Sequence, residues 1–328
     1  MISLGILMMA VAASAESVPS PEELFRRVVE APAAVFAGRV RTEGADGRAR
    51  LQTIKYAPGG RLRREILGED GRPVRLTVSD GKREWTQDLK SGRHWSGPPA
   101  EPWQRRLGPD ETERVSSAYE MTSSTGEAVA GRETWRLDLH PRTGARPGRR
   151  LWVDRVHGLV LKSRSVRPDG EKSLETGFDA IVFPEKPEAA WFKFAPPAGE
   201  PSYARAQADE SALADARRAG LDPKLPAWLP SGFVFEGLKV LDYRKGKRLI
   251  HFRFSDGASV VSLFQCPPRS RLDFGKRPKE KVRVAGSQGY LSWTEEGNLL
   301  GWGTPGARMV LVGPLGFDVL KRVAESIR

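Results

Sequence analysis

Cysteine and histidine are scarce in this chain of 328 residues. The single cysteine, Cys266, excludes a disulfide framework within the monomer and a cysteine-rich zinc site. No two of the four histidines lie within 15 residues of each other, so the short histidine pairs that bind metal ions are absent. The sequence therefore predicts neither a metal site nor a cofactor.

Long hydrophobic runs are lacking too. The apolar run at residues 2–13 is too short to span a bilayer, and Ala13-Ser14-Ala15 follows it. A short apolar run before an Ala-x-Ala site is typical of a signal peptide, although a buried N-terminal helix is the alternative. We expect export with cleavage after Ala15, so that residues 1–15 are removed. No other run reaches about 18 residues, so the mature chain should contain no transmembrane segment.

Catalytic motifs are absent, or they lack the secondary structure and the companion motifs that they require. Gly301–Gly306 matches a dinucleotide-binding fingerprint, but Pro305 lies inside it and an extended run follows where a helix should begin. Ser79 and Lys82 have the spacing of penicillin-binding enzymes without the companion motifs. The sequence therefore does not predict an enzyme.

Turn signals and alternating hydrophobicity are abundant instead. Five Asp-Gly pairs supply the positive φ of tight hairpins. Residues 74–79 and 135–140 alternate between apolar and polar side chains, which indicates antiparallel strands with one wet face. We predict a mainly β (α+β) fold: an open antiparallel half-barrel over residues 16–197, then a linker over 198–225. A smaller antiparallel sheet domain with a C-terminal helix follows over 226–328.

A short helix beginning at Ser20-Pro21 and ending before Pro32 is expected to plug the half-barrel with Leu24, Phe25 and Val28. The concave face of such a sheet can form an open apolar cavity. The same side chains can equally fill a closed core. The candidate lining residues are Leu76, Val78, Trp85, Leu89, Trp135, Leu137 and Leu139.

Positive charge is concentrated in the second domain. Residues 223–328 hold 18 basic and 9 acidic groups, and residues 269–283 read as a basic loop. This loop is either simply solvated, or it contacts anionic lipid headgroups, or it contacts an acidic protein partner. Nucleic acid is not expected as a partner of an exported chain. The candidate contacts are Arg269, Arg271, Lys276, Arg277, Lys279, Lys281 and Arg283.

These motifs resemble a known family. The order of an early helix, Leu76–Lys82 with Trp85, Gly131–Trp135, Leu151–Asp154 and Phe192–Phe194 is similar to the lipoprotein-carrier superfamily of hydrophobic half-barrels. The segments Trp228–Phe233, Phe254–Gly257 and Ala324–Ile327 resemble the C-terminal domain of the MucB/RseB family.

The resemblance implies a periplasmic regulator of an envelope-stress sigma factor. Such a protein binds the periplasmic part of a membrane anti-sigma factor, shields it from proteolysis, and releases it when lipopolysaccharide or mislocalised lipoprotein arrives. The alternative hypothesis is a periplasmic carrier or sensor that holds the acyl chains of lipoproteins or other lipids in the cavity.

Overall fold

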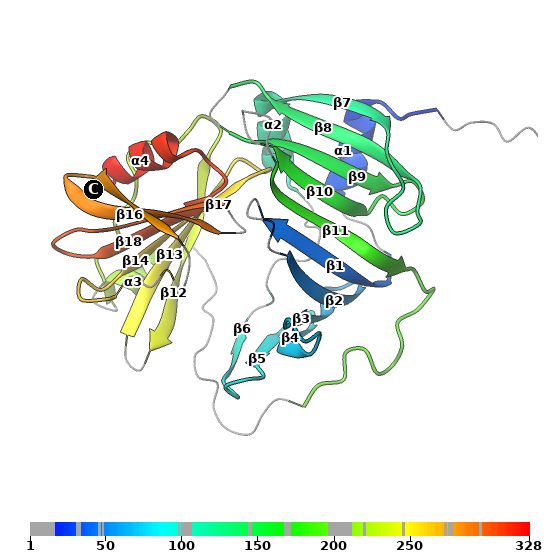
Figure 1. The fold of residues 1–328 in the computed structure, drawn as a ribbon, viewed down its shortest axis with the longest axis horizontal. Helices are drawn as coiled ribbons and strands as arrows, with labels where there is room; N and C mark the ends of the chain where they lie inside the picture. The colour runs from blue at the N-terminus through cyan, green and yellow to red at the C-terminus, as the bar shows by residue number, and fades with distance from the viewer. Residues whose placement is uncertain are drawn as a thin grey trace, which may run out of the picture.

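The computed structural model describes residues 17–328 except 31–33, 45–46, 48, 98, 100–106, 144–145, 167–171, 196–211, 219–220, 245–246, 272–273, 275–277 and 295–296. The expected signal peptide, residues 1–15, lies outside the described residues. Within the described ranges, no helix is long and apolar enough to cross a membrane. Two β-sheets lie beside each other, and short helices pack on both (Figure 1).

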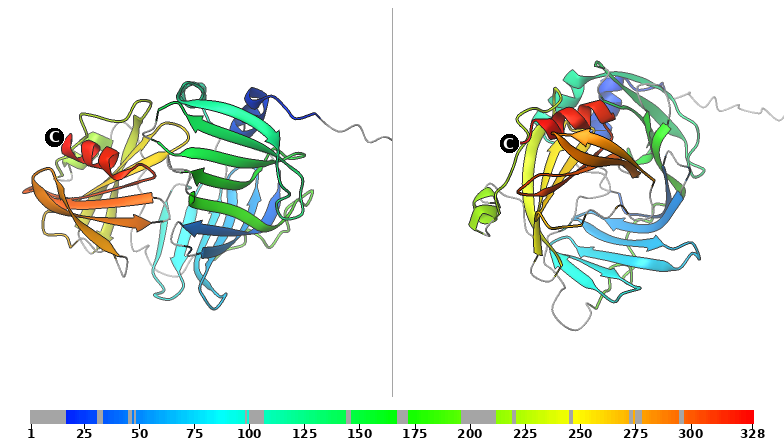
Figure 2. Two further views of the ribbon diagram at one scale, coloured as in Figure 1. Left: turned by 45° about the horizontal axis from the view of Figure 1, so that its top comes forward. Right: turned by 60° about the vertical axis from the view of Figure 1, so that its left-hand side comes forward.

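The first sheet has eleven strands, and its neighbours pair in the order β6-β5-β4-β3-β2-β1-β11-β10-β9-β8-β7. Each pairing is antiparallel. The sheet is strongly curved, and its edge strands β6 and β7 leave it open (Figure 2). Its strands are β1 (Phe36–Gly44), β2 (Ala49–Ala57), β3 (Arg61–Leu67), β4 (Pro73–Asp80), β5 (Glu84–Asp88), β6 (His94–Gly97), β7 (Tyr119–Thr125), β8 (Thr134–Pro141), β9 (Gly148–Asp154), β10 (Val160–Val166) and β11 (Lys172–Val182).

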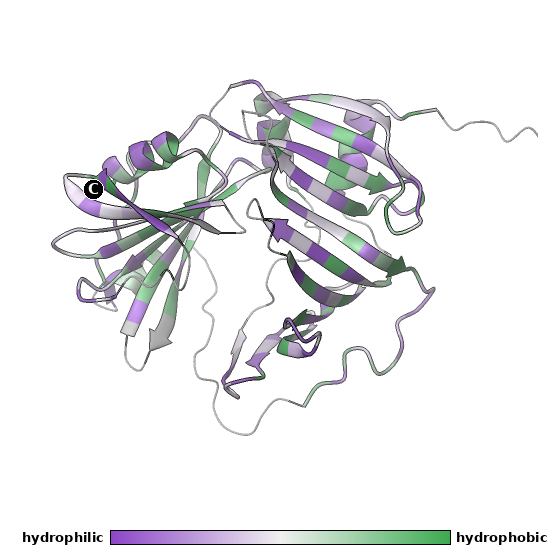
Figure 3. Cartoon of the chain, viewed as in Figure 1, coloured by the Kyte–Doolittle hydropathy of each residue, from purple (hydrophilic) through white to green (hydrophobic). Residues whose placement is uncertain are grey.

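The second sheet has seven antiparallel strands in the order β12-β13-β14-β18-β17-β16-β15. Apolar and polar residues alternate along the strands of both sheets (Figure 3). The predicted mainly β fold, an open large sheet followed by a smaller one with a closing helix, is therefore confirmed. The strands are β12 (Val234–Arg244), β13 (Lys247–Ser255), β14 (Val260–Cys266), β15 (Lys279–Val284), β16 (Ser287–Thr294), β17 (Gly297–Gly303) and β18 (Arg308–Gly313).

Helix α1 (Pro21–Val29) begins where the sequence predicts. The Ser20 hydroxyl accepts a hydrogen bond from the backbone N–H of Glu23 at 3.1 Å and so caps the helix. Leu24 and Phe25 are buried in one cluster with β8 residues, so the helix covers one face of the first sheet.

Helix α2 (Pro109–Ala118) was not predicted, although its start carries a recognisable signal. Pro109 occupies the first turn, and the Glu111 carboxylate accepts a hydrogen bond from the backbone N–H of Gly108 at 2.9 Å. Only Val115 of this helix is buried. A helix with so little apolar surface leaves almost no helical periodicity in its sequence.

Two helices pack on the second sheet. Helix α3 (Ala212–Arg218) contacts β12, and helix α4 (Phe317–Glu325) contacts β15, β17 and β18. Leu320 and Val323 of α4 are fully buried, as the predicted apolar stripe requires, whereas Ile327 lies beyond the helix in a bridge to Pro226. Thus α3, which falls within the predicted linker, packs against the second sheet. The domain boundaries themselves stay a prediction.

Candidate functional site

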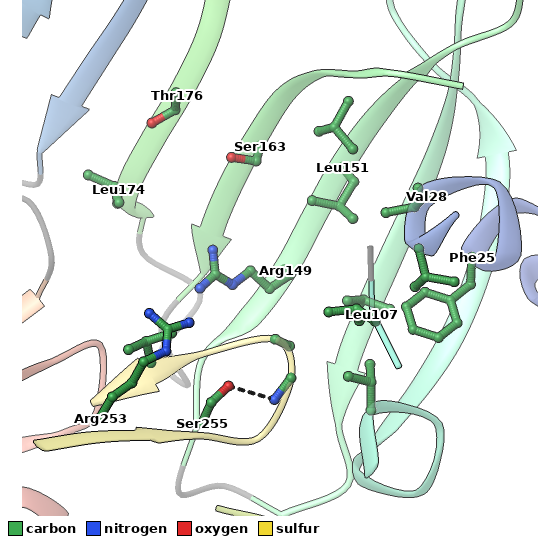
Figure 4. Close-up of a pocket in the computed structure, with 17 residues that line it drawn as sticks. Phe25, Val28, Leu107, Arg149, Leu151, Ser163, Leu174, Thr176, Arg253 and Ser255 are labelled. Atoms are coloured by element: carbon green, nitrogen blue, oxygen red, sulfur yellow. Dashed lines mark hydrogen bonds between the residues drawn. The ribbon is translucent and has the colours of Figure 1, made fainter. Parts of the chain in front are cut away.

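A pocket of about 510 Å³ lies at the seam between the two sheets. One wall comes from helix α1, the α2 region and strands β8–β11, and the other comes from the β13–β14 hairpin (Figure 4). The first wall is lined by Phe25, Val28, Val29, Leu107, Val115, Leu139, Arg149, Leu151, Val160, Ser163, Leu174 and Thr176. The second is lined by Arg253, Ser255, Gly257, Ala258 and Val260.

Strand alternation decides which β9 side chains enter the pocket. Successive side chains of a strand point to opposite faces, so Arg149 and Leu151 share one face and Arg150 takes the other. Arg149 and Leu151 line the pocket, whereas the Arg150 guanidinium donates to the Asp138 carboxylate at 2.7 Å on the outer face. The wall is therefore apolar except for Arg149 and a few hydroxyl groups.

The tip of the β13–β14 hairpin docks against the first sheet through a buried ion pair. Asp256 and Arg146 have 0% and 3% of their side chains exposed, and the Arg146 guanidinium donates to Asp256 Oδ2 at 3.2 Å. The hydroxyl of Tyr119 on β7 lies 3.3 Å from the same oxygen. Arg146 also donates to the backbone carbonyl of Ser231. These contacts join both sheets through one carboxylate.

The docking of the β13–β14 hairpin requires a glycine at position 257, at the hairpin tip. Its φ is +89°, and a Cβ atom there would lie 2.6 Å from Cγ2 of Val115. A left-handed φ favours glycine, and the close approach leaves no room for a side chain. The Asp256-Gly257 pair therefore forms the predicted hairpin turn and also fits it against α2.

The electrostatics of the seam follow from burial. Burial, reinforced by the negative charge of Asp256, raises the pKa of Tyr119 to about 12, so this phenol is neutral and available as a hydrogen-bond donor. Burial lowers the pKa of Arg149 from its ordinary value. The Nε atom of Arg149 is buried and has no hydrogen-bond partner.

The predicted cavity residues do not gather in one place. Leu139 lines the pocket, whereas Trp135 and Leu137 are fully buried in the cluster beneath α1. The other four lie on or next to β4 and β5, several strands away in the sheet order. There Val78 is buried, Leu76 and Trp85 are half-buried, and Leu89 is 42% exposed.

The predicted basic loop is partly a strand, which corrects the sequence interpretation. Lys279, Lys281 and Arg283 lie on edge strand β15, exposed and at alternate positions, while Val284 is buried. This period of two predicts a strand, but the prolines and glycine before it obscured the pattern. Arg269 and Arg271 are exposed beyond β14, and Lys276 and Arg277 lie outside the described residues.

Sequence reasoning did not identify Arg146, Arg149 or the docking role of Asp256. The Asp256-Gly257 pair signalled a hairpin, but nothing local indicated that its tip contacts the other sheet. Arg146 and Arg149 belong to a stretch with several arginines, residues 142–150, in which only tertiary packing separates buried from exposed positions.

Comparisons with known proteins concern both the family and the fold. Residues 66–179 match the MucB/RseB N-terminal domain family. No curated protein sequence matches the chain. The crystal structure of MucB is similar with a TM-score of 0.62 and 20% identity, covering 94% of this chain and 97% of that one. The complex structure of Pseudomonas aeruginosa MucA/MucB has a TM-score of 0.61 and 19% identity, covering 94% and 98%. The crystal structure of MucB in complex with MucA(peri) has a TM-score of 0.60 and 19% identity, covering 94% of this chain and 98% of that one.

Proposed function

We propose that this chain is a periplasmic regulator that binds the periplasmic part of a membrane anti-sigma factor, because residues 66–179 match the MucB/RseB N-terminal domain family and the fold is similar to that of MucB. By holding that segment it would shield the anti-sigma factor from proteolysis and so keep an envelope-stress sigma factor inactive. The proposed role is binding, and it assigns no catalytic residue. The chain would be exported and its signal peptide cleaved after Ala15.

The observation that carries this proposal is the likeness to MucB over both sheets. The likeness covers 94% of this chain, and MucB has been solved bound to MucA(peri). The covered part of this chain therefore includes strands of both sheets. A partner that contacts either sheet of MucB would find a corresponding surface here.

We propose edge strand β15 and the turn after β14 as the contact for an acidic segment of the partner. Lys279, Lys281 and Arg283 present three cations on one face of the strand, and Arg269 and Arg271 are exposed nearby in sequence. An unpaired strand edge also offers backbone groups to an extended peptide. Charge complementarity would speed association and make it dependent on salt.

Isothermal titration calorimetry with a purified partner segment tests both the proposed binding of the anti-sigma factor and the proposed contact at β15. The ligand would be the periplasmic segment of a single-span anti-sigma protein, to be sought among the genes beside the one for this chain. Nanomolar to micromolar binding is expected, whereas no binding at protein concentrations of about 100 µM would refute the proposed function.

The contact surface is tested with a charge-reversal pair, Lys281→Glu with Arg283→Glu. We expect at least about tenfold weaker binding and a shallower dependence on salt. The matched control reverses Arg72 and Lys90, which are exposed in turns of the first sheet, and should leave affinity unchanged. Equal affinity of both variants would remove β15 from the contact while leaving the partner in place.

We further propose that the seam pocket holds an acyl chain of a lipidated envelope component, which makes the protein a sensor as well as a binder. The pocket's volume lies within the roughly 300–1,000 Å³ range of small-ligand sites, and its lining is mostly apolar. If no anti-sigma partner exists, this pocket supports the alternative function, a periplasmic carrier or sensor of lipoprotein or lipid. Failure of the purified protein to bind any acylated ligand would remove this second proposal.

A further inference from the structure

The seam pocket has two chemically different ends. Arg149 and Arg253 lie toward one end, and Phe25, Val28 and Leu107 lie at the other (Figure 4). Leu151 and the Ser163 hydroxyl also line the wall of the first sheet. A ligand that fills this space must therefore carry a polar group at one end and an apolar body at the other.

Arg149 is a half-buried cation that interacts electrostatically with Asp256, a carboxylate already paired with Arg146. Its register neighbours on the pocket face are Leu139 and Ser165, and its Nε has no hydrogen-bond partner. On the outer face of the same sheet the situation is the opposite, because Arg150 and Arg164 are each paired with a carboxylate. One carboxylate, Asp256, therefore interacts with two guanidinium groups, and an anion beside Arg149 would balance the second positive charge.

Arg253 adds a second guanidinium whose charge is already balanced. Its Nε donates to the Glu236 carboxylate at 2.5 Å. Arg146 and Asp256 balance each other in the same way behind the pocket. Among the described residues that line the pocket none is acidic, so the charge that is left over is the single positive charge of Arg149. A monoanionic head matches this balance.

The size of the pocket limits how large the apolar part of the ligand can be. About 510 Å³ is the volume of a site for one drug-sized ligand, which suits one acyl chain rather than the several chains of a glycolipid. We infer that the seam pocket binds a single-chain anionic amphiphile, with its carboxylate or phosphate head on Arg149 and Arg253 and its chain directed toward Phe25 and Leu107. This inference rests on the proposal above that the pocket holds an acyl chain.

The experiment compares three twelve-carbon probes: laurate and dodecyl phosphate below their micelle-forming concentrations, and dodecanol below its solubility limit. Binding to residues 16–328 is measured by calorimetry. A guanidinium that pairs with a carboxylate or phosphate forms charge-assisted hydrogen bonds, so at least one anionic probe should bind about tenfold or more tightly than dodecanol. Which anion binds more tightly then distinguishes a carboxylate source from a phosphate source.

Two variants show whether Arg149 binds the anionic head group of the ligand. Arg149→Met should abolish the preference for the anionic probes while dodecanol affinity is kept. The melting temperature of the free variant should not fall, because methionine replaces a guanidinium whose buried Nε has no hydrogen-bond partner. Arg150→Met is the matched control on the outer face, since Asp138 keeps its contact with Arg136 at 2.9 Å, and it should retain the full preference.

The outcomes separate this inference from the proposal on which it rests. Equal affinity of the wild-type protein for all three probes would overturn the anionic head but keep the acyl pocket. An unchanged preference in Arg149→Met would also overturn the assignment of Arg149. No binding of any probe would overturn both the inference and the acyl pocket.

Discussion

Replacing Asp256 by asparagine is expected to destabilise the protein by about 3–5 kcal/mol, the cost of leaving one partner of a buried ion pair alone. Asp256 is fully buried, and Arg146, with 3% of its side chain exposed, would keep its charge without a counter-charge. Asparagine preserves the turn, because its side-chain oxygen can still accept the hydrogen bonds from the backbone N–H groups of Ala258 and Ser259. The predicted loss therefore comes from the seam alone.

Asp80 provides a matched control for the turn. It also precedes a glycine of positive φ, and its carboxylate accepts hydrogen bonds from the backbone N–H groups of Lys82 and Arg83, both at 2.7 Å. Asp80 is exposed, however, and Gly81 of its turn packs against Gly59 and Gly60 of the first sheet. Asp80→Asn should therefore cost less than about 1.5 kcal/mol, the net worth of an ordinary hydrogen bond.

The assay is urea unfolding followed by tryptophan fluorescence. Adding Arg146→Met to Asp256→Asn removes the stranded charge and should restore at least about 2 kcal/mol, which a double-mutant cycle measures. If Asp256→Asn costs no more than Asp80→Asn, or if Arg146→Met restores nothing, the ion pair does not hold the seam and the reasoning is refuted.

Three further predictions concern burial and ionisation. Trp135→Ala should lower the free energy of unfolding by about 3–5 kcal/mol in urea titrations, because the ring is 1% exposed. Tyr119 should ionise near pH 12 in absorbance at 295 nm, so its part of the stability should persist below about pH 10, be lost between about pH 10 and 12, and be absent from Tyr119→Phe. Burial raises the pKa of Asp154, but hydrogen bonds from Arg132 and His157 outweigh it and lower the pKa. The stabilisation from Asp154 should therefore be full above about pH 4 and fade in stronger acid, where wild type and Asp154→Asn should converge in thermal melts.

Much of the fold could be predicted because its signals are local. Asp70-Gly71, Asp80-Gly81 and Asp256-Gly257 all form turns with a positive φ at the glycine, and in each an Asp carboxylate accepts backbone hydrogen bonds. A tight turn depends on two to four neighbouring residues, so its sequence is sufficient to identify it. The capping of α1 by Ser20 is local in the same sense.

The site could not be predicted in the same way because it depends on contacts between distant segments. Tyr119 and Arg146 lie 137 and 110 residues from Asp256, and nothing in the spacing of these residues reveals that they meet. The alternation of β8 correctly indicated a shared face for Trp135, Leu137 and Leu139. Only packing determines that α1 seals the first two beneath it and leaves the third at the pocket.

Binding of a membrane anti-sigma factor can be tested by affinity capture from the host. Residues 16–328 would be immobilised and offered detergent-solubilised envelope extract, and the bound proteins and lipids identified by mass spectrometry. We expect enrichment of one single-span membrane protein that carries a cytoplasmic sigma-binding segment. A range of mature lipoproteins without such a partner would contradict the regulatory function and favour the carrier.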